Sequence, residues 1–307
     1  MLDSVYEHLL DLQNKICKDI SIIDKKDCFF QPWASPQEKT QGQGIITYFN
    51  KGQLLEKGCA NISTIHGHVT EKMQHLIPQH LYQEKSKYFY SVASMGLIFH
   101  PYSPFVPSVH SHYRYFEITD ESKNVLCWYF GGGADLTPYY LVEDEAIHFH
   151  KTLKEACDKV NPNLYQPLKK EADKYLYIPH RKEHRGIGGV FSLRLHDRPK
   201  EEAYDWFVNC SNSFLDCYVP IVKNGMDKSF NERNRKWQLL RRAHYVEFNL
   251  IYDTGFHFAL HLDEEHYVKT VFMSMPPVVE WDYDFIIEPN SPEEDMQNVL
   301  KCPRDWV

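Results

Sequence analysis

Short polar turns join successive strand patterns in this chain, and this feature limits the fold more than any other. Residues 113–118 and 125–130 are rich in aromatic residues and can pair across the polar turn at residues 119–124. Strand and helix patterns do not alternate regularly, whereas a parallel sheet needs a crossover connection between its strands. We therefore predict an α+β fold with an antiparallel sheet.

Apolar periodicity gives the remaining elements. We expect an opening helix that starts with the capping box Ser4-x-x-Glu7, followed by a loop at residues 31–44. Further helices are predicted at residues 71–81, 143–160, 199–222 and 232–242. Further strands are predicted at residues 45–49, 54–57, 244–252, 256–262, 270–275 and 278–281, with a hairpin turn at residues 253–255. Because the chain shows neither repeats nor a linker, we predict a single domain, residues 1–307.

Composition excludes several classes of protein. The net charge is −8 and no basic run could follow a phosphate backbone, so we expect no nucleic-acid partner. The eight cysteines form no CxxC pair, which favours a reducing compartment. The N-terminus lacks the pattern of a signal peptide, and no segment approaches the roughly 18 apolar residues of a membrane span. These observations predict a cytoplasmic protein without a transmembrane segment.

Two histidine pairs are candidates for chemistry. On a strand His110 and His112 face the same side and could share a metal ion, or they could be a hydrogen-bonded pair in a pocket. Their HxHx4E pattern resembles the first cupin motif, but no second cupin motif follows. His148 and His150 lie about 200° apart on a helix, so at most one of them can face a given site.

Glycine and arginine clusters supply the other candidates. The triplet Gly131-Gly132-Gly133 follows an aromatic strand, which indicates a sharp bend or the close approach of another group to the backbone. Asp135 follows this triplet and either forms a turn or lines a site. His180-Arg181 and Arg185 stand beside a second glycine-rich stretch, which suits anion recognition as well as an ordinary sheet edge.

Taken together, these motifs resemble the oxygen-dependent coproporphyrinogen III oxidase family. The resemblance runs along nearly the whole chain in the family's order. It rests on His100-Pro101, His110, residues 113–117, residues 128–138, His148-Phe149-His150, His180-Arg181, residues 185–189, 245–250, 273–277 and 304–307.

The resemblance implies a homodimer with a large antiparallel sheet flanked by helices on both faces. It implies an O2-dependent oxidative decarboxylation in heme biosynthesis that turns porphyrinogen propionates into vinyl groups, with no organic cofactor. From it we predict His110, Asp135 and Arg185 as catalytic residues. The predicted substrate-binding residues are His112, Arg114, Gly131, Gly132, Gly133 and Arg181. A divalent metal, if used, would be held by His100, His110, His150 and His180, or by His110 and His112.

The chain departs from the family's pattern where the substrate is held. Leu193 or its neighbour replaces an aspartate, Thr254 replaces an arginine, and Asp263-Glu264-Glu265 stands in a turn that normally ends in arginine. Such arginine contacts are worth roughly 1.5–3 kcal/mol each. Other cations could take over their role, namely Arg114, Arg181, Arg194 or Lys269.

Three functions follow from this pattern. The first is the family's decarboxylation, of coproporphyrinogen III or of a smaller or less anionic acid. The second is a divergent, histidine-ligated metal-dependent oxygenase. The third is a non-catalytic porphyrin binder. A fold resemblance by itself does not choose among them.

Overall fold

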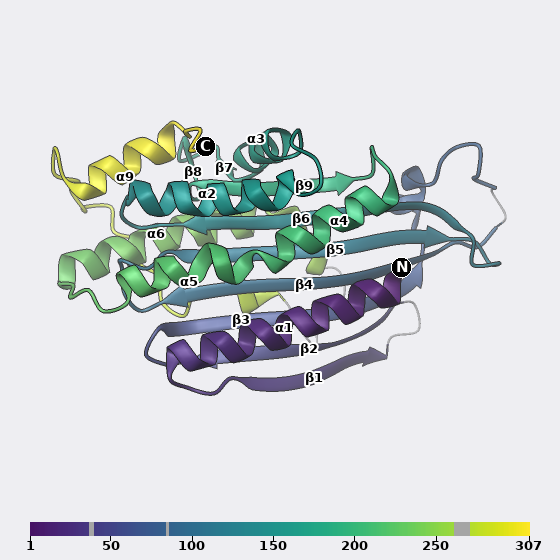
Figure 1. Ribbon diagram of the computed structural model, residues 1–307, viewed down its shortest axis with the longest axis horizontal. Coiled ribbons are helices and arrows are strands. Elements are labelled where there is room, and N and C mark those ends of the chain that lie inside the picture. Colours follow the sequence, from purple (N-terminus) through teal and green to yellow (C-terminus); the bar gives the residue numbers. More distant parts are fainter. Residues whose placement is uncertain (37–39, 84–85, 261–270) are drawn as a thin grey trace.

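A computed structural model describes residues 1–36, 40–83, 86–260 and 271–307, and its centre is a seven-stranded antiparallel sheet (Figure 1). The strands lie in the order β1-β2-β3-β4-β5-β6-β9, and β7 and β8 form a separate small hairpin. The bounds are β1 Phe29–Pro36, β2 Thr40–Asn50, β3 Leu55–His68, β4 Phe89–Pro101, β5 Ser108–Thr119, β6 Val125–Thr137, β7 Tyr177–Ile178, β8 Glu183–His184 and β9 Gly188–Leu195. The predicted α+β class is confirmed.

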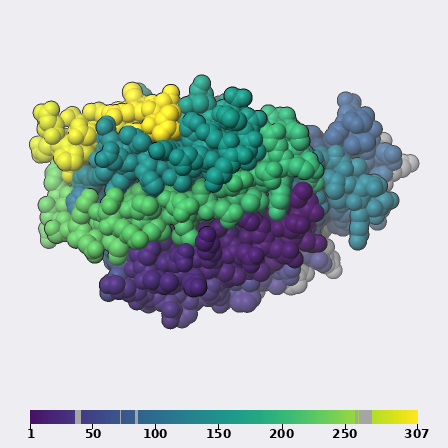
Figure 2. Space-filling view, in the orientation of Figure 1, coloured from purple at the N-terminus to yellow at the C-terminus, as the bar shows by residue number. Residues whose placement is uncertain are grey.

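Helices lie on both faces of the sheet. One face is covered by α1 (Leu2–Asp24), α2 (Glu143–Asp158), α4 (Lys200–Asn212) and α5 (Phe214–Gly225), and in Figure 2 their atoms hide the strands beneath them. Behind the sheet lies α6 (Glu232–Ile251), and α3 (Tyr165–Tyr175) packs on β9. The other elements are α7 (Thr254–Ala259), α9 (Pro292–Lys301) and the 3-10 turns η1 (Glu71–Leu76) and η3 (Phe272–Ser274).

Strand β5 shows how the sheet divides its side chains between two environments. Tyr113 and Tyr115 are fully buried, and Tyr113 packs against Trp206 and Phe207 of α4 at ring distances of 6.1 and 5.7 Å. Because alternate residues of a strand face opposite sides, the even-numbered residues of β5 face α6. The candidate histidines and Arg114 are therefore placed on the face opposite α4.

The predicted strand at residues 244–252 was wrong, since residues 244–251 belong to α6 and Tyr252 is its C-cap. Its aromatic and β-branched run is equally compatible with a buried helix, and a short apolar run does not distinguish the two by periodicity. Arg241, Tyr245, Phe248 and Asn249 are buried at helical spacing.

The rest of the predicted C-terminal β region was also wrong. Asp253 does not form a hairpin turn: its Oδ1 accepts from the amides of Gly255 and Phe256, which caps α7. Residues 272–274 form η3, and residues 278–281 have no regular structure. Part of the predicted strands, at residues 261–262 and 270, lies outside the described residues.

The predicted loop at residues 31–44 was wrong as well, because β1 and β2 occupy its described part. Pro32 and Pro36 fit β1 because it is an edge strand, where no neighbour requires their missing N–H groups. Trp33 lies across Gly44 and donates from Nε1 to Asn61 Oδ1 at 2.8 Å.

Most predicted helices are confirmed in place, with different bounds. The opening helix begins at Leu2, so Ser4 lies inside it instead of capping it. The segment 199–222 forms two helices that meet at Ser213, and the segment 71–81 contains only η1. The hairpin at residues 45–57 and the pairing of residues 113–118 with 125–130 are confirmed.

Candidate active site

His110, Asp135 and Arg185 form one connected cluster on the α6 side of the sheet. His110 on β5 and Asp135 on β6 are direct register partners, and His110 Nδ1 lies 2.9 Å from Asp135 Oδ1. Arg185, just after β8, donates from Nη2 to both Asp135 oxygens at 2.6 and 2.7 Å. The three predicted catalytic residues therefore lie together.

Helix α6 holds Arg185 from the other side. Its Nη1 donates to Asn249 Oδ1 at 3.1 Å, and its Cζ lies 4.9 and 4.8 Å from the rings of Tyr245 and Phe248. These contacts are within the range of cation–π attraction. Tyr245 and Asn249 were not predicted as supports because their apolar surroundings favoured a strand; their i, i+4 spacing on a helix would have put them on one face.

Asp135 and Arg185 stay ionised although both are buried. Burial by itself would raise the pKa of Asp135, but the charge of Arg185 and the hydrogen bond from His110 hold that pKa below its usual value. Burial by itself would lower the pKa of Arg185, but the negative charge of Asp135 raises this pKa above its usual value. An ionised Asp135 accepts the Nδ1 proton of His110, which leaves the lone pair on Nε2.

His110 is the member of the cluster that a reactant can reach. Its side chain is 27% exposed, against 2% for Arg185 and 8% for Asp135. Within the described part of the chain, the His110 ring bonds Asp135 through Nδ1, and its Nε2 makes no hydrogen bond. The arrangement suits proton transfer at Nε2.

His112 and Arg114 extend the same row along β5. Arg114 Nη1 lies 3.4 Å from His112 Nδ1, and Nη2 donates to the Leu193 carbonyl at 2.8 Å. Burial first, and then the charge of Arg114, lower the pKa of His112 well below its usual value. His112 is therefore a neutral hydrogen-bonding group beside a cation.

The glycine triplet of β6 lies opposite this row and could not hold larger residues. Gly132 has φ +110°, and a Cβ there would lie 1.8 Å from the His112 carbonyl oxygen. A Cβ on Gly133 would lie 1.8 Å from the Val190 oxygen, and one on Gly131 would lie 3.2 Å from the Arg114 guanidinium. The triplet thus lets Arg114 lie close over the sheet.

The structure does not bring His100, His110, His150 and His180 together, so the prediction of a metal site formed by these four histidines was wrong. Both ring nitrogens of His100 bond to protein atoms, Ser108 Oγ and the Ser274 carbonyl, at 2.9 and 3.0 Å. His150, from α2, bonds Tyr165 and the Ile187 carbonyl at 2.8 and 3.0 Å. Among the described residues, no three or more His, Cys, Asp or Glu side chains are arranged to hold a metal ion.

His180 and Arg181 both bond Glu247 of α6. Arg181 donates to its two oxygens at 2.8 and 2.6 Å, and His180 Nε2 lies 2.7 Å from Oε2. Burial by itself would raise the pKa of Glu247. Hydrogen bonds to its carboxylate, of which the one from Arg181 has the largest effect, lower this pKa to about 2. Arg181, predicted to bind substrate, therefore already has a carboxylate partner.

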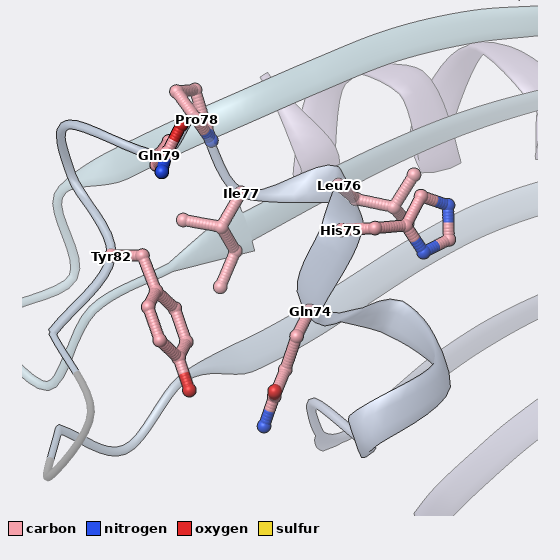
Figure 3. A pocket seen from close by; sticks show the side chains of 7 residues that line it. All are labelled: Gln74, His75, Leu76, Ile77, Pro78, Gln79 and Tyr82. Atoms are coloured by element: carbon pink, nitrogen blue, oxygen red, sulfur yellow. The ribbon is translucent and has the colours of Figure 1, made fainter.

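A cavity of about 440 Å³ lies elsewhere, at η1. It is lined by Gln74, His75, Leu76, Ile77, Pro78, Gln79 and Tyr82 (Figure 3). The turn η1 connects β3 to β4 near Phe89, whose register partner is Thr119. Nine residues of β5 separate Thr119 from His110, which is about 30 Å of strand. This cavity is not part of the His110 cluster.

Comparisons with known proteins agree with this geometry. The family model for coproporphyrinogen III oxidase matches residues 4–306. The chain belongs to the coproporphyrinogen III oxidase family.

Relatives in this family carry the name oxygen-dependent coproporphyrinogen-III oxidase. The chain is 37% identical to the mitochondrial protein of Rattus norvegicus over 97% of its own length and 67% of the relative's. It is 36% identical to the protein of Francisella philomiragia, over 97% of this chain and 96% of that one. It is also 36% identical to the Drosophila melanogaster protein, over 97% of this chain and 76% of that one.

Among the described residues, α-helices of sufficient length and apolarity to cross a bilayer are absent.

Proposed function

We propose that this chain catalyses the O2-dependent oxidative decarboxylation of a porphyrinogen propionate, with coproporphyrinogen III as the first substrate to test. In balanced form, R–CH2–CH2–COOH and O2 give R–CH=CH2, CO2 and H2O2. The carboxyl carbon leaves as CO2, the adjacent carbons form the double bond, and O2 takes up the two electrons. The supporting observation is the buried Asp135–Arg185 ion pair bonded to the accessible His110.

Each residue has a distinct part in this proposal. Asp135 orients the imidazole of His110 and keeps its Nδ1 protonated, so that Nε2 can take or return a proton on the substrate. Arg185 holds Asp135 ionised. His112 and Arg114 hold a substrate carboxylate, and the glycine triplet forms the floor beside them. A homodimer, a cytoplasmic location and a single domain remain predictions.

An aerobic assay with coproporphyrinogen III tests the proposal. Formation of protoporphyrinogen with release of CO2 is expected, and H110Q should lower kcat by about 10²–10⁴-fold. H148Q is the matched control, since His148 lies on α2, across the sheet, and its ring bonds the Asp216 carbonyl. Absence of turnover in a folded wild-type protein that binds the porphyrin would instead support a non-catalytic binder.

A metal-dependent oxygenase is the second candidate, and one observation favours it. His110 and His112 project from the same face of β5, as two ligands of one ion must. Metal analysis of untagged protein distinguishes the candidates: about one iron or copper per chain, lost in H112Q, supports the oxygenase. Full turnover by protein with far less than one metal per chain contradicts it.

A further inference from the structure

We propose that Arg194 joins Arg114 in a two-guanidinium site that binds a second carboxylate of the substrate, away from the reacting one. This inference rests on the proposed function, because it concerns the same face of the sheet. It names the substrate class as a flat molecule with at least two widely separated carboxylates.

The two arginines share one aromatic neighbour. Arg114 on β5 and Arg194 on β9 flank the intervening strand β6, and their Cζ atoms lie 5.8 and 5.7 Å from the centre of the Tyr129 ring. That ring is fixed by stacking on Phe116 at 4.7 Å. Cation–π attraction keeps both guanidiniums over the ring while their N–H groups stay available to a carboxylate.

Charge pairing distinguishes these two arginines from their neighbours. Arg185 is paired with Asp135, and Arg181 with Glu247. The other arginines with carboxylate partners are Arg198, Arg233, Arg235, Arg241, Arg242 and Arg304. Within the described ranges, the bonds of Arg114 go to His112 and the Leu193 carbonyl, and Arg194 contacts the Tyr129 ring and lies near Cys127, with no carboxylate partner.

Because both Cζ atoms lie within about 6 Å of one ring centre, the two guanidiniums are at most about 12 Å apart, and an anion between them would offset their mutual repulsion. Among the described residues the nearby Glu171 carboxylate bonds the Leu193 amide at 2.6 Å and forms an ion pair with neither arginine, so a bound substrate can supply the anion. Of the four cations that could replace the missing arginines, Arg181 is already paired, and Lys269 lies outside the described residues. Arg114 and Arg194 are therefore the two of these four that can bind a substrate carboxylate without first losing a carboxylate partner among the described residues.

The spacing along β5 sets the distance between the two carboxylates. Arg114 lies four residues after His110, which is about 14 Å of antiparallel strand. A short monocarboxylic acid at His110 would not reach the two arginines. A macrocycle with carboxylates on opposite sides would.

Equilibrium binding tests the inference without requiring turnover. Coproporphyrin III, the stable oxidised porphyrin with four carboxylates, is titrated into the protein with tryptophan fluorescence as the signal, and its tetramethyl ester is titrated in the same detergent. We expect R194Q to raise Kd for the acid about 3- to 10-fold, which is modest because Arg194 is exposed. R194K should have a smaller effect, and the ester should bind R194Q and wild type equally.

R198Q is the control, because it removes one nearby positive charge that is already paired with Asp197 and Glu202. It should change Kd less than twofold. If both arginines hold the same carboxylate, the effects of R114Q and R194Q will be non-additive in the double variant.

Equal Kd values for R194Q and R198Q would overturn the inference. So would an R194Q variant that loses as much affinity for the tetramethyl ester as for the acid. So would a wild type that does not bind the acid. A protein that binds coproporphyrin III through Arg194 but does not turn over coproporphyrinogen would keep the site and reject the proposed reaction.

Discussion

His110 and Asp135 face each other across β5 and β6, so the orientation of the imidazole follows from the strand register. Their 2.9 Å contact requires no loop to close and no helix to move. A shift of one residue in this register would send Asp135 to the α4 side of the sheet. The sheet therefore positions this pair, and Arg185 and α6 supply its charge balance and cover.

Replacing Asp135 should destabilise the protein as well as inactivate it. D135N leaves the guanidinium of Arg185 buried without its counter-charge, and we expect a loss of about 3–5 kcal/mol in the free energy of unfolding, measured by denaturant titration. The double variant D135L/R185M removes both charges and should recover at least half of that loss while staying inactive. If the double variant is no more stable than D135N, the ion pair is not the cause.

The glycine triplet should tolerate no side chain at its second position. G132A places a Cβ 1.8 Å from a backbone oxygen at φ +110°, and we expect it to cost about 2–4 kcal/mol. G96A on neighbouring β4 is the matched control, since its Cβ would approach other atoms no closer than 3.6 Å. Thermal unfolding of both variants compares them, and equal midpoints would contradict the close-approach argument.

Acid should weaken the fold through His150. Burial comes first among the causes that lower the pKa of this histidine from 6.5 to about 4, so the folded protein resists its protonation. The unfolded chain takes up the proton below about pH 6.5. The contribution of His150 to the free energy of unfolding is therefore complete above pH 6.5. It falls by about 3 kcal/mol as the pH decreases toward 4.

H150Q tests this linkage, because glutamine stays neutral at every pH. Urea unfolding of H150Q between pH 4 and 7 should show a shallower decline than that of wild type. His100 and His112, whose pKa values are also lowered by burial, will leave part of the slope. Parallel declines in the two proteins would show that His150 is not protonated on unfolding.

Arg181 should contribute little to substrate binding. Its guanidinium is already engaged by both oxygens of Glu247, so R181Q should change KM less than about threefold. R114Q removes a cation without a carboxylate partner among the described residues, and KM should rise about tenfold or more. Steady-state kinetics with the same substrate compares the two, and a larger effect of R181Q would reverse these assignments.

The sequence by itself determined the class of fold, the positions of α1, α2, α4, α5 and the start of α6, and the β5–β6 pairing, but it missed α3. The resemblance also singled out His110, Asp135 and Arg185, which the fold brings together. These features depend on local periodicity and on motifs that keep their order along the chain. For Gly131-Gly132-Gly133 the sequence left open a sharp bend or the close approach of another group, and the contacts of Gly132 and Gly133 favour the close approach.

Only the tertiary structure decided which residues share a site. Residues 244–252 have an apolar composition that suits a strand or a helix, and packing against the sheet selected the helix that brings Tyr245 and Asn249 to Arg185. The separation of His100, His150 and His180, and the pairing of Arg181 with Glu247, depend on contacts between residues far apart in the chain. Local sequence cannot encode such contacts on its own, because each is set by how several elements pack around the sheet.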